Sequence, residues 1–177
     1  MNGRECIWKY KTPEGFDDLW MRGNGETLTG LWFDGSRDTA LQEAETCKTP
    51  VFRDTCRWLD EYFSGCAPAF TPHYRIDGLT PFRQDVIDEL LRIPYGATAS
   101  YGDVAKAISA KHGGKAVSAR AVGGAVGWNP IAILIPCHRV IGADASLTGY
   151  GGGLGNKLSL LAHEGSAVFE RQCPIEP

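Results

Sequence analysis

The hydrophobic pattern of the chain changes at a stretch with three prolines between residues 68 and 81. Proline removes a backbone donor and interrupts helices and central strands, so this stretch is typical of a linker. Before it, residues 18–34 predict a hairpin, because two largely apolar segments flank a glycine-asparagine-glycine turn. Residues 51–63 space their apolar side chains at helical intervals. We therefore expect an N-terminal domain over residues 1–79. It would consist of a small sheet and a helix, followed by the linker.

Helix signals dominate the second half of the chain. Thr80-Pro81 is typical of a helix start, with threonine as the cap and proline at the first helical position. Ser100 and Ser118 predict the caps of two further helices, and a fourth helix is expected to reach His163. A mostly helical C-terminal domain over residues 80–177 follows. The expected fold class of the whole chain is α/β (α+β).

The second and third of these helices are joined by a turn that contains Gly113-Gly114, which favours a helix-turn-helix unit. The connection is longer than the usual three or four residues. The helix after Ser118 is rich in small residues and carries Arg120 near its start. Small side chains permit close approach to a nucleic-acid groove, but they equally permit close packing against neighbouring helices.

Charge is unevenly distributed along the chain. The net charge is -3, which argues against a strongly basic nucleic-acid binder. Residues 101–140 nevertheless hold five basic side chains and one acidic side chain, a balance of +4. This local excess fits a face that contacts DNA phosphates or an ordinary solvated helix surface.

A short apolar run, residues 131–135, leads into Pro136-Cys137-His138-Arg139. We expect the run to be a buried strand or extended segment. A nucleophilic cysteine needs a proton acceptor, positive potential and access, and His138 and Arg139 follow Cys137 directly. Adjacent side chains of an extended segment point to opposite faces, so a bend or a bridging water must couple Cys137 to His138. By itself the pair is more typical of a buried structural thiol beside a packed imidazole.

Three further features favour the reactive cysteine. Residues 148–153 form a glycine-rich loop without the pattern of a phosphate loop, suited either to closing over a flat ligand or to a flexible connection. Glu164 could orient His138, or it could be an exposed carboxylate at a helix end. Asn129 precedes the cysteine run and could brace a neighbouring turn.

The six cysteines contain no C-x-x-C pair, and the N-terminus lacks the apolar stretch of a secretory signal. We interpret the cysteines as mainly free thiols in a cytosolic protein, with no zinc site and no cofactor. No apolar run approaches the roughly 20 residues that span a bilayer, so no membrane partner is expected.

Taken in order, these motifs resemble one family. The residues are Ala119 to Ala125, Asn129-Pro130, Pro136 to Val140, Gly149-Tyr150 with Gly152 to Leu154, and Leu160 to Gly165. Over about residues 80–166 the chain is similar to the methylated-DNA–protein-cysteine methyltransferases. The resemblance implies a suicide alkyltransferase that moves an alkyl group from the O6 oxygen of guanine to a cysteine, with the O4 oxygen of thymine as a second candidate source. It also implies a helix-turn-helix that enters the minor groove, base flipping, and one turnover per molecule.

The same resemblance assigns roles to individual residues. Cys137 matches the acceptor, His138 the histidine that deprotonates it through a water, and Glu164 the acid that holds that histidine. Asn129 braces the site, and Tyr101 presses on a phosphate and helps to protonate the leaving guanine. Arg120 enters the base stack in place of the extruded nucleotide. The remaining positions are DNA-binding Ser118, Ala121, Gly123 and Gly124 and the base-pocket residues Tyr150, Gly151 and Val140.

The expected partner is double-stranded DNA that contains alkylated guanine, bound by a monomer with no obligate protein partner. The expected location is cytoplasmic and DNA-associated, or nuclear in a eukaryotic source. Two other functional classes are alternatives. One is a non-enzymatic relative that flags alkylated DNA, in which the cysteine is replaced. The other is a Cys-His-Glu hydrolase, which would turn over repeatedly and would not need the helix of Arg120.

Overall fold

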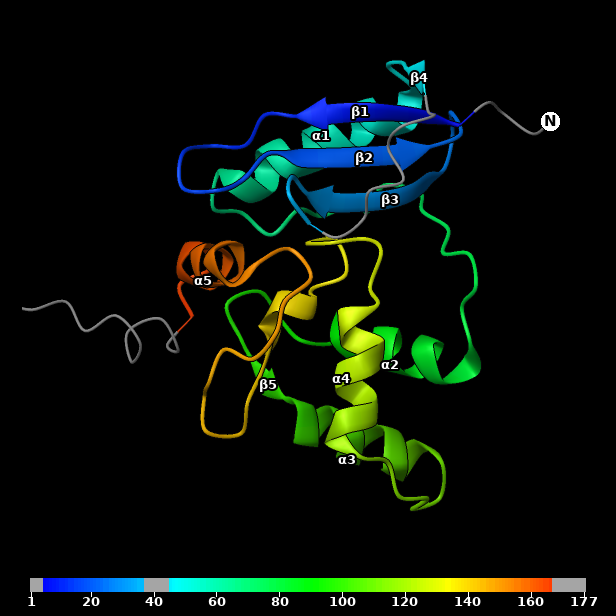
Figure 1. The fold of residues 1–177 in the computed structure, drawn as a ribbon, viewed down its shortest axis with the longest axis vertical. Helices are drawn as coiled ribbons and strands as arrows, with labels where there is room; N and C mark the ends of the chain where they lie inside the picture. Colours follow the sequence, from blue (N-terminus) through cyan, green and yellow to red (C-terminus); the bar gives the residue numbers. More distant parts are fainter. Residues whose placement is uncertain (1–4, 37–44, 167–177) are drawn as a thin grey trace, which may run out of the picture. The chain divides into compact units, whose positions relative to one another are not determined.

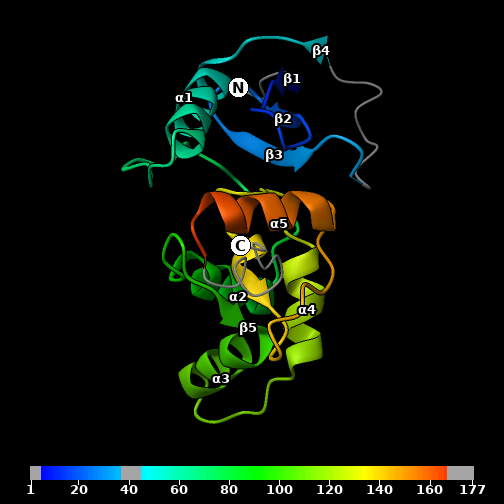
Figure 2. The ribbon, with the colours of Figure 1, turned by 90° about the vertical axis from the view of Figure 1, so that its left-hand side faces the viewer.

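The computed structural model describes residues 5–36 and 45–166 and divides the chain into two compact units. One unit holds Met1–Gly78 together with Pro130–Leu134, and the other holds Leu79–Asn129 together with Ile135–Pro177 (Figures 1 and 2). A short segment in front of Cys137 thus belongs to the first unit. Among the described residues, no helix combines the length and apolar character needed to cross a membrane.

The first unit is a four-stranded sheet with a helix. Its strands, in the spatial order β3-β2-β1-β4, are β1 (Cys6–Tyr10), β2 (Leu19–Gly23), β3 (Leu28–Phe33) and β4 (Glu45–Thr46). The predicted hairpin is confirmed, because β2 and β3 pair antiparallel across the glycine turn. The predicted helix is α1 (Pro50–Phe63), capped by the Thr49 side chain, and its apolar stripe is buried. Figure 1 shows α1 alongside one face of this sheet.

The sequence did not predict β1 or β4, and the cysteine assignment needs a correction. Cys6 and Cys47 form a disulfide, so the expectation of mainly free thiols is wrong for this pair. Cys6 lies in β1 and Cys47 directly follows β4, so the parallel pairing of these strands leaves the two cysteine Cα atoms 5.7 Å apart, a separation that a disulfide spans. Cys56, Cys66 and Cys137 are free thiols, and Cys173 lies outside the described residues.

The apolar run in front of Cys137 is buried as expected, but the expectation of a strand or extended segment over residues 131–135 is wrong. Ile131 makes an isolated parallel bridge to Leu31, and the chain then turns, with the Leu134 amide donating to the Ala132 carbonyl at 2.8 Å. Ile133 occupies the left-handed region with φ 66°. Burial of apolar side chains does not require ladder pairing, and here the turn satisfies the backbone in place of a partner strand.

The second unit is mostly helical, as predicted. It contains α2 (Pro81–Leu91), α3 (Tyr101–Lys111), α4 (Ala119–Gly127) and α5 (Leu154–His163), with the short strands β5 (Ala99–Ser100) and β6 (Val140–Ile141). The three predicted caps are confirmed: Thr80 accepts from the Arg83 amide, Ser100 from Asp103 and Ser118 from Ala121. Helices α2, α3 and α4 pack against one another through buried aliphatic side chains.

One small sheet positions the site within this unit. Strand β5 pairs parallel with β6, which aligns Ala99 with Val140 and Ser100 with Ile141. Because β5 runs directly into α3 and β6 directly follows the cysteine turn, the pairing fixes the start of α3 beside the segment that carries Cys137.

Candidate active site

Cys137 begins a short 3₁₀ turn, Cys137–Arg139. The Cys137 amide donates to the Ile135 carbonyl at 2.8 Å, and the Arg139 amide donates to the Pro136 carbonyl at 3.0 Å. The turn supplies the bend that the sequence required, so Cys137 and His138 do not alternate across a strand. Cys137 is only 7 % exposed, so a substrate must enter the site to reach its sulfur.

His138 is completely buried and lies 2.9 Å from Glu164, measured from Nε2 to Oε1. Glu164 also accepts from Arg139, whose Nε lies 2.8 Å from Oε2 and whose Nη2 lies 2.9 Å from Oε1. Arg139 is in turn held by the Ile93 carbonyl, which accepts from Nη1 at 2.8 Å. Burial alone would raise the pKa of Glu164. The hydrogen bonds from His138 and Arg139 outweigh this effect, so the pKa of the Glu164 carboxyl lies well below its usual range and the group stays ionised.

Gly96 completes the shell around the carboxylate. Its amide donates to Glu164 Oε2 at 3.1 Å, and its φ of +77° lies in the left-handed region. A Cβ at this position would lie 2.8 Å from the Glu164 carbonyl oxygen. Glycine is therefore required here both by the backbone conformation and by the close approach.

Asn129 binds the cysteine turn from the end of α4. Its Nδ2 donates to the Ile135 carbonyl at 2.9 Å and lies 3.0 Å from the Cys137 sulfur. The side-chain amide therefore braces the turn and offers a hydrogen bond to the thiolate form of Cys137.

The resting protonation states follow from burial. Burial raises the pKa of the Cys137 thiol, although the Asn129 amide, the Lys157 cation and the Tyr150 hydroxyl each oppose this rise. Burial lowers the pKa of His138, which Glu164 opposes. A neutral thiol therefore lies in the same turn as a neutral imidazole. Within the described chain, the buried His138 Nδ1 has no hydrogen-bond partner, so this nitrogen can accept a proton while Nε2 donates to Glu164.

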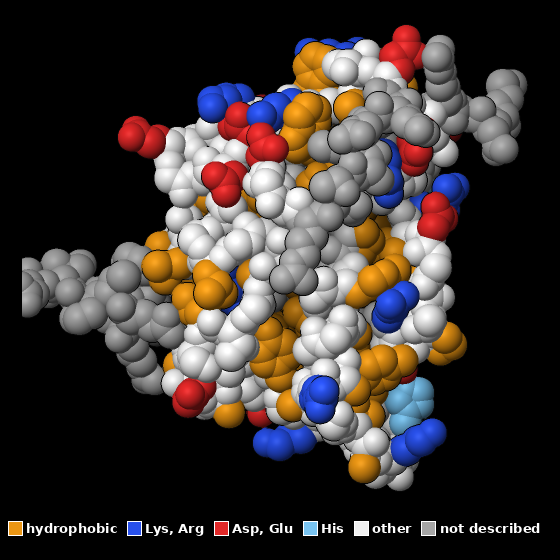
Figure 3. Space-filling view, in the orientation of Figure 1, with side chains coloured by type: hydrophobic (Ala, Val, Ile, Leu, Met, Phe, Trp, Pro, Cys, Tyr) orange, Lys and Arg blue, Asp and Glu red, His pale blue; other side chains and the backbone are white. Residues whose placement is uncertain are grey.

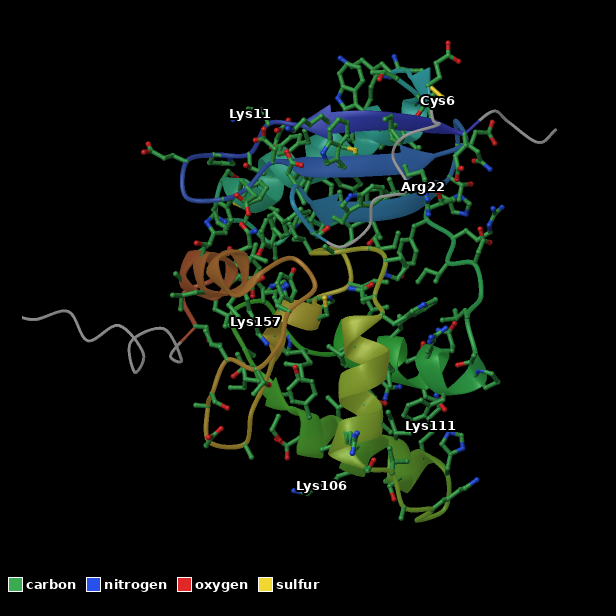
Figure 4. All side chains as sticks on the ribbon, in the orientation of Figure 1. Cys6, Lys11, Arg22, Lys106, Lys111 and Lys157 are labelled. Atoms are coloured by element: carbon green, nitrogen blue, oxygen red, sulfur yellow. A yellow bond between two sulfur atoms is a disulfide. The ribbon has the colours of Figure 1, made fainter. Side chains whose placement is uncertain are left out.

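The sequence interpretation missed Lys157. Its side chain is fully buried, and Nζ donates to the Val140 carbonyl at 2.7 Å and to the Thr148 carbonyl at 3.2 Å (Figure 4). Burial lowers its pKa to about 8. A signal was present, since Lys157 shares the helical face of Leu160, Leu161 and Glu164 at spacings of three, four and seven residues.

Comparisons with known proteins agree with this arrangement. Residues 81–166 match a family model described as the DNA binding domain of 6-O-methylguanine DNA methyltransferase. A methylated-DNA–protein-cysteine methyltransferase of Methanosarcina acetivorans is 47% identical over 158 residues, which cover 89% of this chain and 96% of that protein. A protein of the same name from Mycobacterium bovis is 43% identical over 151 residues, which cover 84% and 86%. The chain belongs to the methylated-DNA–protein-cysteine methyltransferase family.

Solved structures of relatives are also similar to this chain. The chain matches an R37L variant of the Mycobacterium tuberculosis O6-methylguanine methyltransferase with a TM-score of 0.78 at 39% identity, covering 92% of this chain and 93% of that chain. A Mycobacterium tuberculosis relative in complex with DNA matches with a TM-score of 0.75 at 37% identity, covering 92% and 96%.

In this family member the glycine-rich loop is tied to helix α3. The Tyr101 hydroxyl donates to the Thr148 carbonyl at 3.4 Å, the same oxygen that accepts from Lys157. The predicted pocket residues differ in exposure: Val140 is buried, Tyr150 is partly exposed with a buried hydroxyl oxygen, and Gly151 is exposed. The loop also lies against the end of α4, since a Cβ on Gly151 would be 3.9 Å from the Gly127 carbonyl oxygen.

Helix α4 has a packed side and an exposed side, and small residues lie on both. Val122 and Val126 are buried, and Gly123 lies against the Tyr101 ring, where a Cβ would be 3.8 Å away. The predicted DNA-facing positions Ser118, Arg120, Ala121 and Gly124 are exposed. The small residues therefore serve close packing on one side and leave a low, open surface on the other. No cluster of histidine, cysteine or acidic side chains suited to a metal ion occurs among the described residues.

Proposed function

We propose that this protein repairs DNA by moving an alkyl group irreversibly from the O6 oxygen of guanine in duplex DNA to the sulfur of Cys137. One observation carries the proposal: Asn129 contacts that sulfur, and the same turn presents His138 to the buried Glu164–Arg139 pair. Packing a structural thiol does not require this arrangement of hydrogen-bonded polar side chains.

The proton of the thiol must leave before the sulfur can attack. His138 Nδ1 is the acceptor in this proposal, with a water relaying the proton, because Nε2 is already committed to Glu164. Glu164 stabilises the imidazolium that results, and Arg139 keeps Glu164 ionised. Asn129 and the Lys157 cation favour the thiolate.

In the chemical step, the sulfur lone pair forms a bond to the alkyl carbon and the bond from that carbon to O6 breaks. The bonding electrons leave with guanine, which departs as a neutral base when a donor supplies a proton. The Tyr101 hydroxyl is the proposed donor, and its ring would press on the neighbouring phosphate. The product is a thioether without a good leaving group, so each molecule acts once.

The target base must leave the helix, because its O6 oxygen cannot be reached inside a duplex. In the proposal, α4 lies in the minor groove, with Ser118, Ala121, Gly123 and Gly124 at the DNA and Arg120 filling the vacated place in the stack. Tyr150, Gly151 and Val140 would line the pocket for the flipped base. The protein would act as a monomer on cytoplasmic or nuclear DNA.

The test uses duplex DNA with a labelled O6-methylguanine. We expect the label to move to the protein, to saturate near one label per chain, and to be absent from Cys137→Ala. Binding without transfer would instead indicate a module that flags damage. Continuing release of label to solvent would indicate a hydrolase. Either of these two results would overturn the proposal.

A further inference from the structure

Lys157 is a buried cation that the proposed chemistry uses only for its charge. Figure 3 shows lysine and arginine side chains projecting from the surface on the face that it views, where water stabilises their charge. The Lys157 side chain is instead completely buried on α5 (Figure 4). Within the described chain, its ammonium group pairs with no carboxylate. A buried charge without a counter-ion is costly, and groups of this kind cluster at functional sites.

The ammonium group joins two segments of the site through backbone carbonyls. Nζ donates to the Val140 carbonyl at 2.7 Å and to the Thr148 carbonyl at 3.2 Å. Val140 begins β6, directly after the turn that carries Cys137, and Thr148 begins the glycine-rich loop, residues 148–153. The glycines of this loop offer no side chains that could hold it in place. The two bonds from the ammonium group therefore set the spacing between β6 and the loop.

The same Thr148 oxygen also accepts from Tyr101, the proposed proton donor. The distance from the Tyr101 hydroxyl is 3.4 Å. This is longer than the roughly 2.5–3.0 Å of a strong O–H···O bond, so the hydroxyl rests beside the loop without being bound tightly. When the hydroxyl turns toward a guanine, Lys157 still donates to the Thr148 carbonyl, so this acceptor keeps a partner.

Helix α5 thus supplies residues to both ends of the proposed proton movement. Lys157 and Glu164 are seven residues apart, so they lie on the same side of α5, about two turns from each other. Glu164 binds His138, the proposed acceptor of the thiol proton. Lys157 binds the carbonyl beside the Tyr101 hydroxyl, the proposed donor to guanine. One helix face therefore fixes the acceptor and the donor relative to each other.

We propose that Lys157 is a positioning residue, whose ammonium group holds the Thr148 carbonyl so that the Tyr101 hydroxyl is placed to protonate the departing guanine. The inference rests on the proposed function, because it assumes that Tyr101 is the proton donor. It goes beyond the effect of the Lys157 cation on Cys137, whose pKa that cation lowers. Loss of the ammonium group should therefore slow the departure of guanine even where the thiolate forms normally.

The experiment separates formation of the thiolate from protonation of guanine. For each variant, the saturated single-turnover rate of methyl transfer from duplex DNA is divided by the rate at which iodoacetamide alkylates Cys137, followed by mass spectrometry. Iodoacetamide needs a thiolate but no proton donor, because iodide leaves as an anion. Lys157→Met keeps the length of the side chain and should leave the Kd for the duplex unchanged. We expect it to lower the ratio by about tenfold to a hundredfold, since a displacement of about 1 Å can cost a hundredfold in rate.

A double-variant cycle identifies the group through which Lys157 acts. Tyr101→Phe removes the hydroxyl and should lower the ratio by about a hundredfold. Because Lys157 acts through that hydroxyl in this proposal, adding Lys157→Met to Tyr101→Phe should lower the ratio hardly further. If the two losses instead multiply to within about twofold, the residues act independently and the inference is overturned.

Lys11→Met is the matched control, because the Lys11 side chain is 86% exposed in the first unit and its loss should change neither rate. If Lys157→Met does not fold, Lys157→Gln takes its place; it removes the charge, shortens the reach of the donor and should lower the ratio in the same direction. A lower melting temperature with an unchanged ratio would assign Lys157 to folding alone, and the inference would fail. If the wild type accepts no label from alkylated duplex DNA, the proposed function fails instead.

Discussion

Replacing Glu164 with glutamine removes a charge while preserving the shape of the side chain. The carboxylate accepts four hydrogen bonds: Oε1 from His138 and Arg139, and Oε2 from Arg139 and the Gly96 amide. A glutamine has one oxygen, so its NH₂ group must face two of these donors in either orientation. When it faces His138, the imidazole must present a lone pair at Nε2 and carry its proton at Nδ1. The nitrogen that should take the thiol proton is then already protonated.

Two magnitudes follow from this arrangement. Arg139 has only 12 % of its side chain exposed, and loss of one partner from a buried ion pair costs about 3–5 kcal/mol. For a chain of this size, a loss near the lower limit lowers the melting temperature by roughly 6–12 °C. A misplaced general base typically costs about 10²–10⁴ in rate. The expected result is a folded, less stable protein that transfers its alkyl group at least a hundredfold more slowly.

The assay is single-turnover transfer from labelled duplex DNA, sampled by rapid quench, with thermal unfolding measured on the same preparation. Glu26→Gln, an exposed position in the turn between β2 and β3, is the matched control and should change neither quantity. The reasoning is refuted if Glu164→Gln transfers at the wild-type rate. It is also refuted if the fraction of the wild-type rate that is lost does not exceed the fraction of protein that is unfolded. In that case Glu164 would support folding and not the proton transfer.

Four other outcomes are expected. First, the pKa of Glu164 is lowered in the folded protein, so its contribution to stability is present above the unfolded value of about 4.3 and is lost as pH falls below it. Urea unfolding between about pH 5 and 3 should therefore show a shallower decline for Glu164→Gln than for the wild type, by up to about 1.4 kcal/mol per pH unit. Equal declines would assign the acid sensitivity to other carboxyls. Second, Gly96→Ala should lower stability by about 1–3 kcal/mol, because alanine must adopt a positive φ and approach Glu164. A melting temperature equal to that of the wild type would contradict this. Third, reduction of the Cys6–Cys47 disulfide should destabilise the first unit by about 4 kcal/mol from loop entropy over a sequence separation of 41. Unfolding with and without reductant measures this effect, and Cys47→Ser should be insensitive to reductant. Fourth, Arg120→Ala should slow repair of duplex DNA more than reaction with the free base. Equal losses on both substrates would exclude a wedge role.

Much of the site could be inferred from the sequence because its chemistry lies in short motifs. Cys137 and His138 are adjacent, and Asn129 is eight residues from the sulfur that it contacts. The three helix caps were also predictable, since each depends on a side chain and an amide three residues apart. Motif order then led to the family, which the comparisons established.

Other parts of the site could not be inferred in this way. The residues alone left two interpretations of Glu164 open, a buried acid that orients His138 or an exposed carboxylate at a helix end, and its burial among donors from His138, Arg139 and Gly96 distinguishes them. Lys157 was overlooked because lysine is normally a surface residue. Two backbone carbonyls satisfy its buried ammonium group, and no local pattern encodes carbonyls that come from distant segments.

By itself, the sequence determined the helices, their three predicted caps and the hairpin, because these depend on interactions within a few residues along the chain. The tertiary structure alone decided how the apolar run at residues 131–135 is used, that Cys6 meets Cys47, and that Arg83 stacks on Trp128. Each of these contacts joins segments between 41 and 100 residues apart, and such contacts depend on which surfaces come together when each unit packs. A run of apolar residues indicates only that the segment will be buried. The fold determines whether the segment pairs as a strand or turns toward a cysteine.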